Sequence, residues 1–164
     1  MEAVTVDTNI LPLNDLESLA AEAGYALEII SVTARELAGT DLLDAARNLG
    51  QTYETAMFGE AFFDGAVLGD IEHAGTLEEI LKVISSGSFP AQADRDELTP
   101  PQRNQLRDAL ILQAHIRSGK RIFVTGDAKA YIKHGRRELF ESRYRIAIYT
   151  KAEFLEHCQA RIGG

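Results

Sequence analysis

Hydrophobic and polar positions follow one another along the chain in blocks that predict strands followed by helices. Apolar runs rich in β-branched residues predict buried strands at 3–6 (AVTV), 27–32 (LEIISV), 121–125 (RIFVT) and 145–150 (RIAIYT). Amphipathic stretches predict helices over about 15–23, 41–58, 76–87 and 99–119, and from 150 onward. Buried strands that alternate with helices are typical of a parallel sheet covered on both faces. The pattern therefore predicts an α/β fold: a three-layer α/β/α arrangement with a mainly parallel central sheet.

Capping boxes mark the predicted helix starts: a Ser, Thr or Asn side chain and a Glu or Gln three residues later cap each other's backbone amides. The best-marked start is Thr99 with Gln102, where Pro100 also occupies a favoured first position. The same spacing occurs at Asn14/Glu17, Thr33/Glu36, Thr76/Glu79 and Thr150/Glu153. Residues 59–75 hold four glycines and predict a loop or a broken helix, and 88–98 predict an exposed loop. We expect one domain over 1–164, with a longer helical and loop segment at about 50–98.

Three acids follow the ends of predicted strands, namely Asp7, Glu36 and Asp127. In open α/β sheets, functional sites lie beyond the carboxyl ends of the strands. From the local sequence, Asp7 is either a cap for the following turn or a metal ligand. For Glu36 it favours helix capping, because Glu153 shows the same spacing after a strand.

Asp108 lies nine residues into its predicted helix, on a mostly apolar row. Asp is unfavourable there unless it has an ion-pair partner, such as a nearby arginine, or a function. The helix and the next strand return the chain antiparallel to itself, so we expect Asp127 to come level with Asp108. Clustered carboxylates repel unless they are protonated or bind a cation, and oxygen ligands suit Mg²⁺ or Mn²⁺.

Charge is distributed unevenly along the chain. The net charge is −8, but residues 101–164 carry 13 basic and 6 acidic side chains, a net of +7, whereas residues 1–100 carry a net of −15. A basic C-terminal part is able to attract phosphate, with a mixed solvated surface as the alternative. The run Lys129, Lys133, Arg136 and Arg137 lies just after Asp127.

Composition argues against several classes of protein. Cys158 is the single cysteine, so the chain has neither an internal disulfide framework nor a cysteine-rich zinc site. No apolar run approaches the roughly 20 residues of a membrane helix, and residues 1–9 lack a signal-peptide pattern. We therefore expect a cytoplasmic protein with no membrane partner.

Four segments together resemble the PIN domain family: VDTNIL at the start, SVTARELAG after the second strand, LRDALILQAHIRSGKRIFVTGDAKAYI, and the closing strand and helix with AEFL. Members of this family are metal-dependent nucleases, and they include the ribonuclease toxins of bacterial toxin–antitoxin pairs. The resemblance covers essentially the whole chain and is weakest at about 50–98.

The resemblance implies an endoribonuclease that hydrolyses RNA phosphodiester bonds with Mg²⁺ or Mn²⁺ held by Asp7, Glu36, Asp108 and Asp127. Thr8, Asn9 and Thr125 match supporting positions, and Lys129, Lys133, Arg136 and Arg137 are the candidates for RNA phosphate contacts. RNA is the implied substrate, and an antitoxin protein and a homodimer are open as partners. Ala128, Lys129 and Ala130 stand where many relatives carry another acid, which leaves one or two metals open.

Two other interpretations compete with a nuclease. The first is a non-catalytic PIN-like module that binds RNA or serves in assembly. The second is a phosphatase of the haloacid-dehalogenase type with Asp7 as nucleophile. That family resembles DxDx[TV] here, and Asn9 replaces its second Asp, which removes the general acid.

Overall fold

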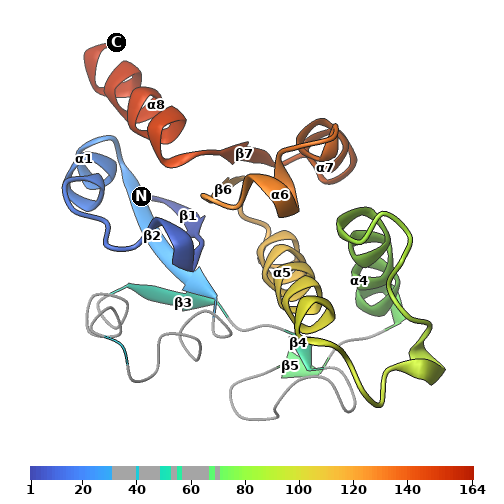
Figure 1. Ribbon diagram of the computed structural model, residues 1–164. Helices are drawn as coiled ribbons and strands as arrows, with labels where there is room; N and C mark the ends of the chain where they lie inside the picture. Colours follow the sequence, from blue (N-terminus) through green and yellow to red (C-terminus); the bar gives the residue numbers. More distant parts are fainter. Residues whose placement is uncertain (31–39, 41–48, 53–54, 57–66, 69–70) are drawn as a thin grey trace.

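A five-stranded, all-parallel sheet forms the centre of the molecule, in the strand order β3-β2-β1-β6-β7. The computed structural model describes residues 1–30, 40, 49–52, 55–56, 67–68 and 71–164 (Figure 1). The strands of this sheet are β1 (Glu2–Val6), β2 (Tyr25–Ile30), β3 (Gly50–Thr52), β6 (Ile122–Val124) and β7 (Ala147–Tyr149). A second, small parallel sheet pairs β4 (Thr55–Ala56) with β5 (Val67–Leu68).

Helices cover both faces of the main sheet, so the predicted three-layer α/β/α fold is confirmed (Figure 1). One face carries α1 (Leu16–Glu22) and α8 (Lys151–Gly163), and the other carries α4 (Ile71–Ile84), α5 (Pro100–Arg117) and α7 (Arg136–Tyr144). The short helix α6 (Ala128–Tyr131) and the 3-10 turns η1 (Thr8–Ile10) and η2 (Gln92–Asp94) complete the described helices. Among these helices, none is long and apolar enough to cross a membrane.

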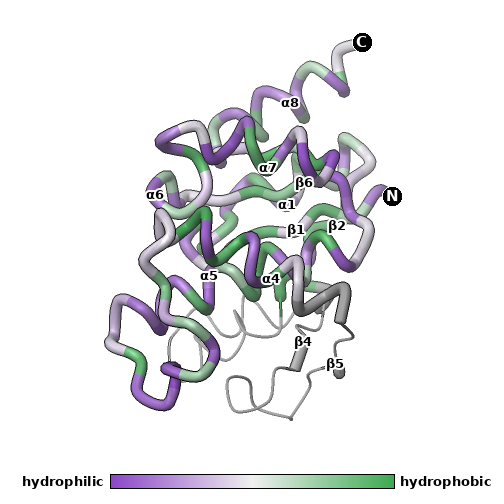
Figure 2. The backbone as a smooth tube through the Cα atoms, turned by 90° about the vertical axis from the view of Figure 1, so that its right-hand side faces the viewer, coloured by the Kyte–Doolittle hydropathy of each residue, from purple (hydrophilic) through white to green (hydrophobic). Residues whose placement is uncertain are grey.

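Strand side chains alternate between two separate apolar cores. Val4 and Val6 of β1 point into the core under α1 and α8, whereas Phe123 of β6 points into the core under α4 and α5. Successive residues of a strand face opposite sides of the sheet, so a strand with apolar residues at successive positions contributes side chains to both cores. Figure 2 shows the hydrophobic positions gathered along β1 and β2 between the helical layers.

Two predicted helix starts are confirmed in detail. Thr99 accepts a hydrogen bond from the Gln102 backbone amide, and the Gln102 side chain accepts one from the Thr99 amide at 2.9 Å. Thr150 and Glu153 cap each other in the same way at the start of α8. Because α5 starts at a fixed point, the level of Asp108 along the helix is also fixed.

The helix predicted over about 15–23 is confirmed as α1, but two other predicted capping boxes are wrong. Asn14 takes a left-handed conformation with φ 51°, so Asp15, rather than Asn14, is the residue before α1. Helix α4 begins at Ile71, which places Thr76 inside the helix instead of at its start.

The segment at about 50–98 also differs from its predicted structure. The helix predicted over 41–58 is wrong at Gly50–Thr52 and Thr55–Ala56, which form β3 and β4. Of the predicted loop or broken helix at 59–75, the described part holds strand β5 and the first turns of α4. The remainder of both predictions, and the Thr33/Glu36 capping box, lie outside the described residues.

Candidate functional site

Strands β1 and β6 are neighbours at the centre of the sheet, and the strands that follow each of them in the chain are added on opposite sides. From β1 the chain moves outward to β2 and β3, and from β6 it moves outward to β7 on the other side. In open α/β sheets a crevice forms at the carboxyl ends of two such strands, and ligands bind there. The amide of Asp7 donates to the carbonyl of Val124 at 2.9 Å, so the first residue after β1 lies beside the end of β6.

Asp7 is a buried carboxylate with four hydrogen-bond donors around it. Only 4% of its surface is exposed. Oδ1 accepts from the backbone amide of Thr8 at 2.8 Å and from its hydroxyl at 3.2 Å. Oδ2 accepts from the Thr125 hydroxyl at 2.8 Å and from the Asn9 side-chain amide at 3.0 Å. The surroundings therefore fix the orientation of this carboxylate at the edge of the sheet.

Burial raises the pKa of the Asp7 carboxyl above its ordinary value, because desolvation disfavours the charged form. Hydrogen bonds from Thr125 and Thr8 oppose that rise, and the nearby negative charge of Asp127 adds to it. A carboxyl whose pKa is raised by burial and by a second carboxylate, at the carboxyl end of a central parallel strand, is a functional-site candidate.

The Thr125 hydroxyl links the side chain of Asp7 to the backbone of Asp127. It donates to Asp7 Oδ2 at 2.8 Å and accepts from the backbone amide of Asp127 at 2.9 Å. A single buried hydroxyl thus sets the position of Asp7 relative to the turn that carries Asp127. The sequence prediction of Thr125 as a supporting residue agrees with this geometry.

Asn9 forms a second bridge between the same loops. Its amide nitrogen donates to Asp7 Oδ2, and its amide oxygen accepts from the backbone amide of Gly126 at 2.7 Å. A Cβ atom added to Gly126 would lie 3.1 Å from Asn9 Oδ1. The close approach of Asn9 therefore leaves little room for a side chain at position 126, and the sequence analysis did not identify Gly126 as part of the site.

Asp127 is half-buried, and its two carboxylate oxygens have different surroundings. Oδ1 accepts from the Ala130 amide at 2.8 Å and caps α6. No hydrogen bond to Oδ2 is present among the described residues. Asp127 is therefore a helix cap through one oxygen, and the second oxygen is available to a ligand.

Asp108 is half-buried on α5 and lies close to the segment that follows Asp127. The hydroxyl of Tyr131, on α6, donates to the backbone carbonyl of Asp108 at 2.9 Å. Tyr131 is fully buried and packs edge-on against Phe123 of β6 at 5.1 Å between ring centres. This contact holds α5 beside α6. The sequence offered no local signal for Tyr131, because its role depends on a partner 23 residues away.

The fourth predicted carboxylate, Glu36, lies outside the described residues. Within the described part of the chain, no group of three or more His, Cys, Asp or Glu side chains is arranged to hold a metal ion. The described geometry therefore brings Asp7 and Asp127 together and places Asp108 on the neighbouring helix.

The predicted phosphate contacts separate into two pairs. Lys129 and Lys133 are exposed. Arg136 is 9% exposed, and its guanidinium donates to the Lys129 carbonyl and to Ser86 Oγ. Arg137 forms an ion pair with Glu153 at 2.9 Å. Because both arginines have intramolecular partners, the two lysines are the better candidates for RNA contacts.

Comparison with known proteins adds no relative: neither the protein-family models nor the curated proteins contain a match to this chain.

Proposed function

We propose that this chain is a metal-dependent endoribonuclease of the PIN-domain kind. The observation that carries the proposal is the proximity of the Asp7 and Asp127 carboxylates at the carboxyl ends of β1 and β6. A buried carboxylate beside a second one is an unfavourable arrangement by itself, and a divalent cation would compensate both charges. Carboxylate oxygens are the ligands that Mg²⁺ and Mn²⁺ prefer.

The residues present fit such a cation. Asp127 Oδ2 is available, and the longest bond to Asp7, 3.2 Å from the Thr8 hydroxyl, frees an acceptor site on Oδ1 when that hydroxyl rotates. Thr125 and Asn9 would then orient Asp7 from behind, as the outer-shell partners of metal ligands commonly do. Glu36 and Asp108 complete the proposed ligand set.

Each part of the chain has a separate task in the proposed reaction. When bound, the cation supplies positive charge that acidifies water and stabilises charge on the phosphate. The carboxylates hold it, and Thr125 and Asn9 keep Asp7 and the 125–127 turn at a constant separation. Lys129 and Lys133, exposed after Asp127, attract the RNA backbone.

The phosphatase alternative receives no support from the geometry around Asn9. A haloacid-dehalogenase-type enzyme needs an acid at this position to protonate the leaving group. The Asn9 amide has no such proton, and both of its ends are engaged, with Asp7 and with Gly126. The non-catalytic module is the alternative that experiment must separate from a nuclease.

A circular single-stranded RNA provides a sharp test, because only an endonuclease can open it. We expect Mg²⁺ or Mn²⁺ to support opening and EDTA to stop it. Asp127→Asn and Asp108→Asn should each lower the rate by more than about 100-fold, since even outer-shell partners of metal ligands typically contribute 10–100-fold. The control is Asp96→Asn, which removes the same charge from an exposed loop.

Equal rates for wild type, Asp127→Asn and Asp108→Asn would refute the assigned site. RNA binding without opening in either metal would favour the non-catalytic module. An antitoxin partner, a homodimer and a cytoplasmic location remain predictions from the sequence.

A further inference from the structure

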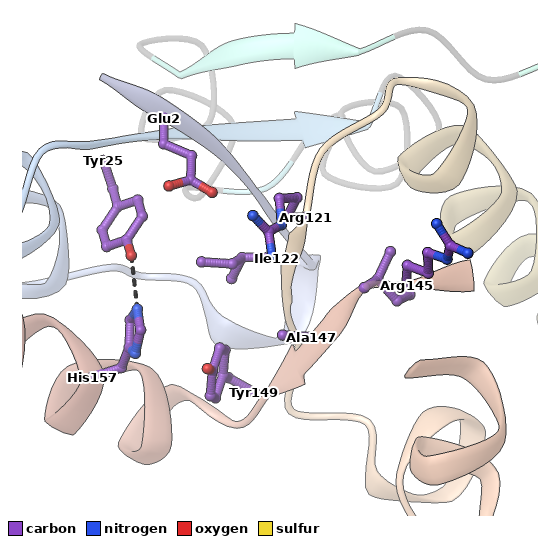
Figure 3. A pocket seen from close by; sticks show the side chains of 9 residues that line it. Glu2, Tyr25, Arg121, Ile122, Arg145, Ala147, Tyr149 and His157 are labelled. Atoms are coloured by element: carbon purple, nitrogen blue, oxygen red, sulfur yellow. Dashed lines mark hydrogen bonds between the residues drawn. The ribbon is translucent and has the colours of Figure 1, made fainter. Parts of the chain in front are cut away.

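A polar pocket opens at the end of the sheet opposite to Asp7 and Asp127, where the strands begin. Its volume is about 300 Å³. Its lining includes the first residue of four strands, Glu2, Tyr25, Ile122 and Ala147, together with His157 of α8 (Figure 3). Asp7, Asp108 and Asp127 do not line it, so it is separate from the carboxylate site.

One wall of this pocket is a fixed polar framework. Tyr25 is 2% exposed, and its hydroxyl lies 2.7 Å from His157 Nε2 and accepts from Arg161 at 2.7 Å. The Arg161 guanidinium also lies 4.6 Å from the centre of the Tyr25 ring and 3.5 Å from the Glu2 carboxylate. Figure 3 shows Tyr25 and His157 pointing toward one another at the side of the pocket. These contacts hold the wall in place without a ligand.

The remaining charges around the pocket favour an anion. Arg121 and Arg145 line it and are exposed, and neither guanidinium has a partner among the described residues. Glu2 is the one carboxylate in the pocket lining, and it already has an ion-pair partner in Arg161 at 3.5 Å. Guanidinium groups bind phosphate through paired, charge-assisted hydrogen bonds.

Arg145 is held in an unusual backbone conformation. It follows the last residue of α7 with φ 55° and ψ 41°, the left-handed region that disfavours side chains. Helices α1, α4 and α5 are each followed by a glycine at positive φ, namely Gly24, Gly87 and Gly119. An arginine where glycine is the common choice is an outlier of the kind that collects at ligand sites.

The floor of the pocket offers aromatic surface. Tyr149 and His157 both line it, are half-buried, and stack with 5.2 Å between ring centres and an interplanar angle of 27°. Ile122 and Ala147 add apolar surface beside them. Flat, partly apolar surface of this kind accepts a nucleobase by stacking.

We propose that this pocket binds a nucleoside monophosphate, with the phosphate on Arg121 and the base against Tyr149 and His157. The volume lies at the small end of ligand pockets and suits a single nucleotide. The inference stands independently of the proposed nuclease function, because it uses neither the acidic residues nor a metal ion.

Calorimetric titration of the full chain with UMP and AMP tests the proposal, with uridine and inorganic phosphate as separate arms. EDTA is present throughout, so that no cation joins the nucleotide to the acidic site. We expect saturable binding of a nucleotide that Arg121→Gln weakens about tenfold. Lys82→Gln on α4 removes the same charge from an exposed side chain outside this pocket and should leave binding unchanged.

Amide chemical shifts locate the bound nucleotide. We expect changes at Tyr25, Ile122 and Ala147, and none at Asp7 or Gly126 at the other edge of the sheet. The proposal is overturned by an absence of saturable binding, by equal affinity in Arg121→Gln and wild type, or by shift changes confined to the other edge. Inorganic phosphate binding as tightly as either nucleotide would overturn the assignment of a nucleotide.

Discussion

The side-chain oxygen of Asn9 accepts a hydrogen bond from the backbone amide of Gly126 at 2.7 Å, so two loops 117 residues apart are joined by one short side chain. The other end of the same amide donates to Asp7. Asn9 therefore transmits the position of the 125–127 turn to the buried carboxylate. Small changes in this turn should alter the site while the two cores stay intact.

Replacing Gly126 with alanine tests this link. The added Cβ would lie 3.1 Å from Asn9 Oδ1, closer than nearly all normal contacts, so Asn9 must shift and loosen Asp7. We expect RNA cleavage to fall by about 10–100-fold, as for other partners that orient metal ligands, with little change in melting temperature. The matched control is Gly75→Ala in α4, where a Cβ meets nothing within 4 Å. That change should stabilise the protein by about 0.5–1 kcal/mol and leave cleavage unchanged. Equal cleavage by both variants would contradict the role of Gly126.

Divalent cations should stabilise the protein in a pH-dependent way. The pKa of Asp7 is raised in the folded state, so the folded state favours its protonated form and loses stability as pH rises through that pKa. A cation offsets the charge of ionised Asp7 and should raise the melting temperature more at pH 7 than at pH 4. At about 100 times its Kd the gain is about 2.7 kcal/mol, or a shift of several degrees.

Thermal melts with Mn²⁺ and with EDTA at both pH values measure this effect. Asp127→Asn should lose the Mn²⁺-induced shift, and Asp96→Asn should keep it. A shift of the same size at both pH values, or one that persists in Asp127→Asn, would exclude Asp7 and Asp127 as the binding carboxylates.

His115 should make the protein sensitive to acid. It is fully buried in α5, its Nδ1 lies 2.8 Å from the Thr5 hydroxyl, and Nε2 has no hydrogen-bond partner among the described residues. Burial lowers the pKa of His115 from 6.5 to about 3, and the charge of Lys120 adds to that effect. Between about pH 6.5 and 3, His115 is therefore protonated in the unfolded chain and neutral in the folded protein. Over that window stability falls as pH falls, by up to about 1.4 kcal/mol per pH unit.

Urea unfolding between pH 7 and pH 4 separates this effect from the titration of carboxylates. His115→Leu removes the titrating group and should flatten the slope relative to wild type, although its stability at pH 7 is lower because Thr5 loses a buried partner. His134→Gln, at an exposed position, should retain the wild-type slope. Parallel slopes for His115→Leu and wild type would show that His115 does not control acid stability.

The lysines and the buried arginine after Asp127 should respond differently to substitution. Lys129→Gln with Lys133→Gln should weaken RNA binding and reduce the salt slope by about 1–2, because each phosphate contact releases about one counterion. Arg136→Gln should instead lower the free energy of unfolding by about 1–3 kcal/mol, since its guanidinium is buried among hydrogen-bond acceptors. Fluorescence anisotropy over a salt series and urea unfolding measure the two effects, with Lys82→Gln as the charge control. An unchanged salt slope in the double lysine variant would leave Lys129 and Lys133 as ordinary surface charge.

Local signals in the sequence were sufficient where one segment determines its own structure. The strands at 3–6, 121–125 and 145–150 and the Thr99/Gln102 box were predicted close to their observed positions, because β-branched runs and caps act over a few residues. The Asn14 box was wrong because Asn also tolerates the left-handed conformation that it adopts.

Predictions that depended on distant partners were less complete. Gly50 of β3 pairs with Glu28 of β2, and the residue pattern within 41–58 does not predict this pairing. The basic run after Asp127 looks uniform in sequence, yet Arg136 is buried and Lys133 is exposed. The positions of Asp7 and Asp127 follow from strand order, but the bridges through Thr125 and Asn9 required the folded structure.

The separation between Asp7 and its partner Thr125 also bears on how the protein is made. The hydrogen bond between them spans 118 residues, and the central strand β1 pairs with β6 only after residues 122–124 exist. Ribosomes add roughly 5–20 residues per second, so a nascent chain carries Asp7 for several seconds before Thr125 and Asp127 emerge. A chain that stalls or is cut before residue 125 lacks Asp127, one of the four proposed metal ligands, and the Thr125 hydroxyl that orients Asp7. During synthesis, the proposed site can therefore be completed only after the 125–127 turn has left the ribosome.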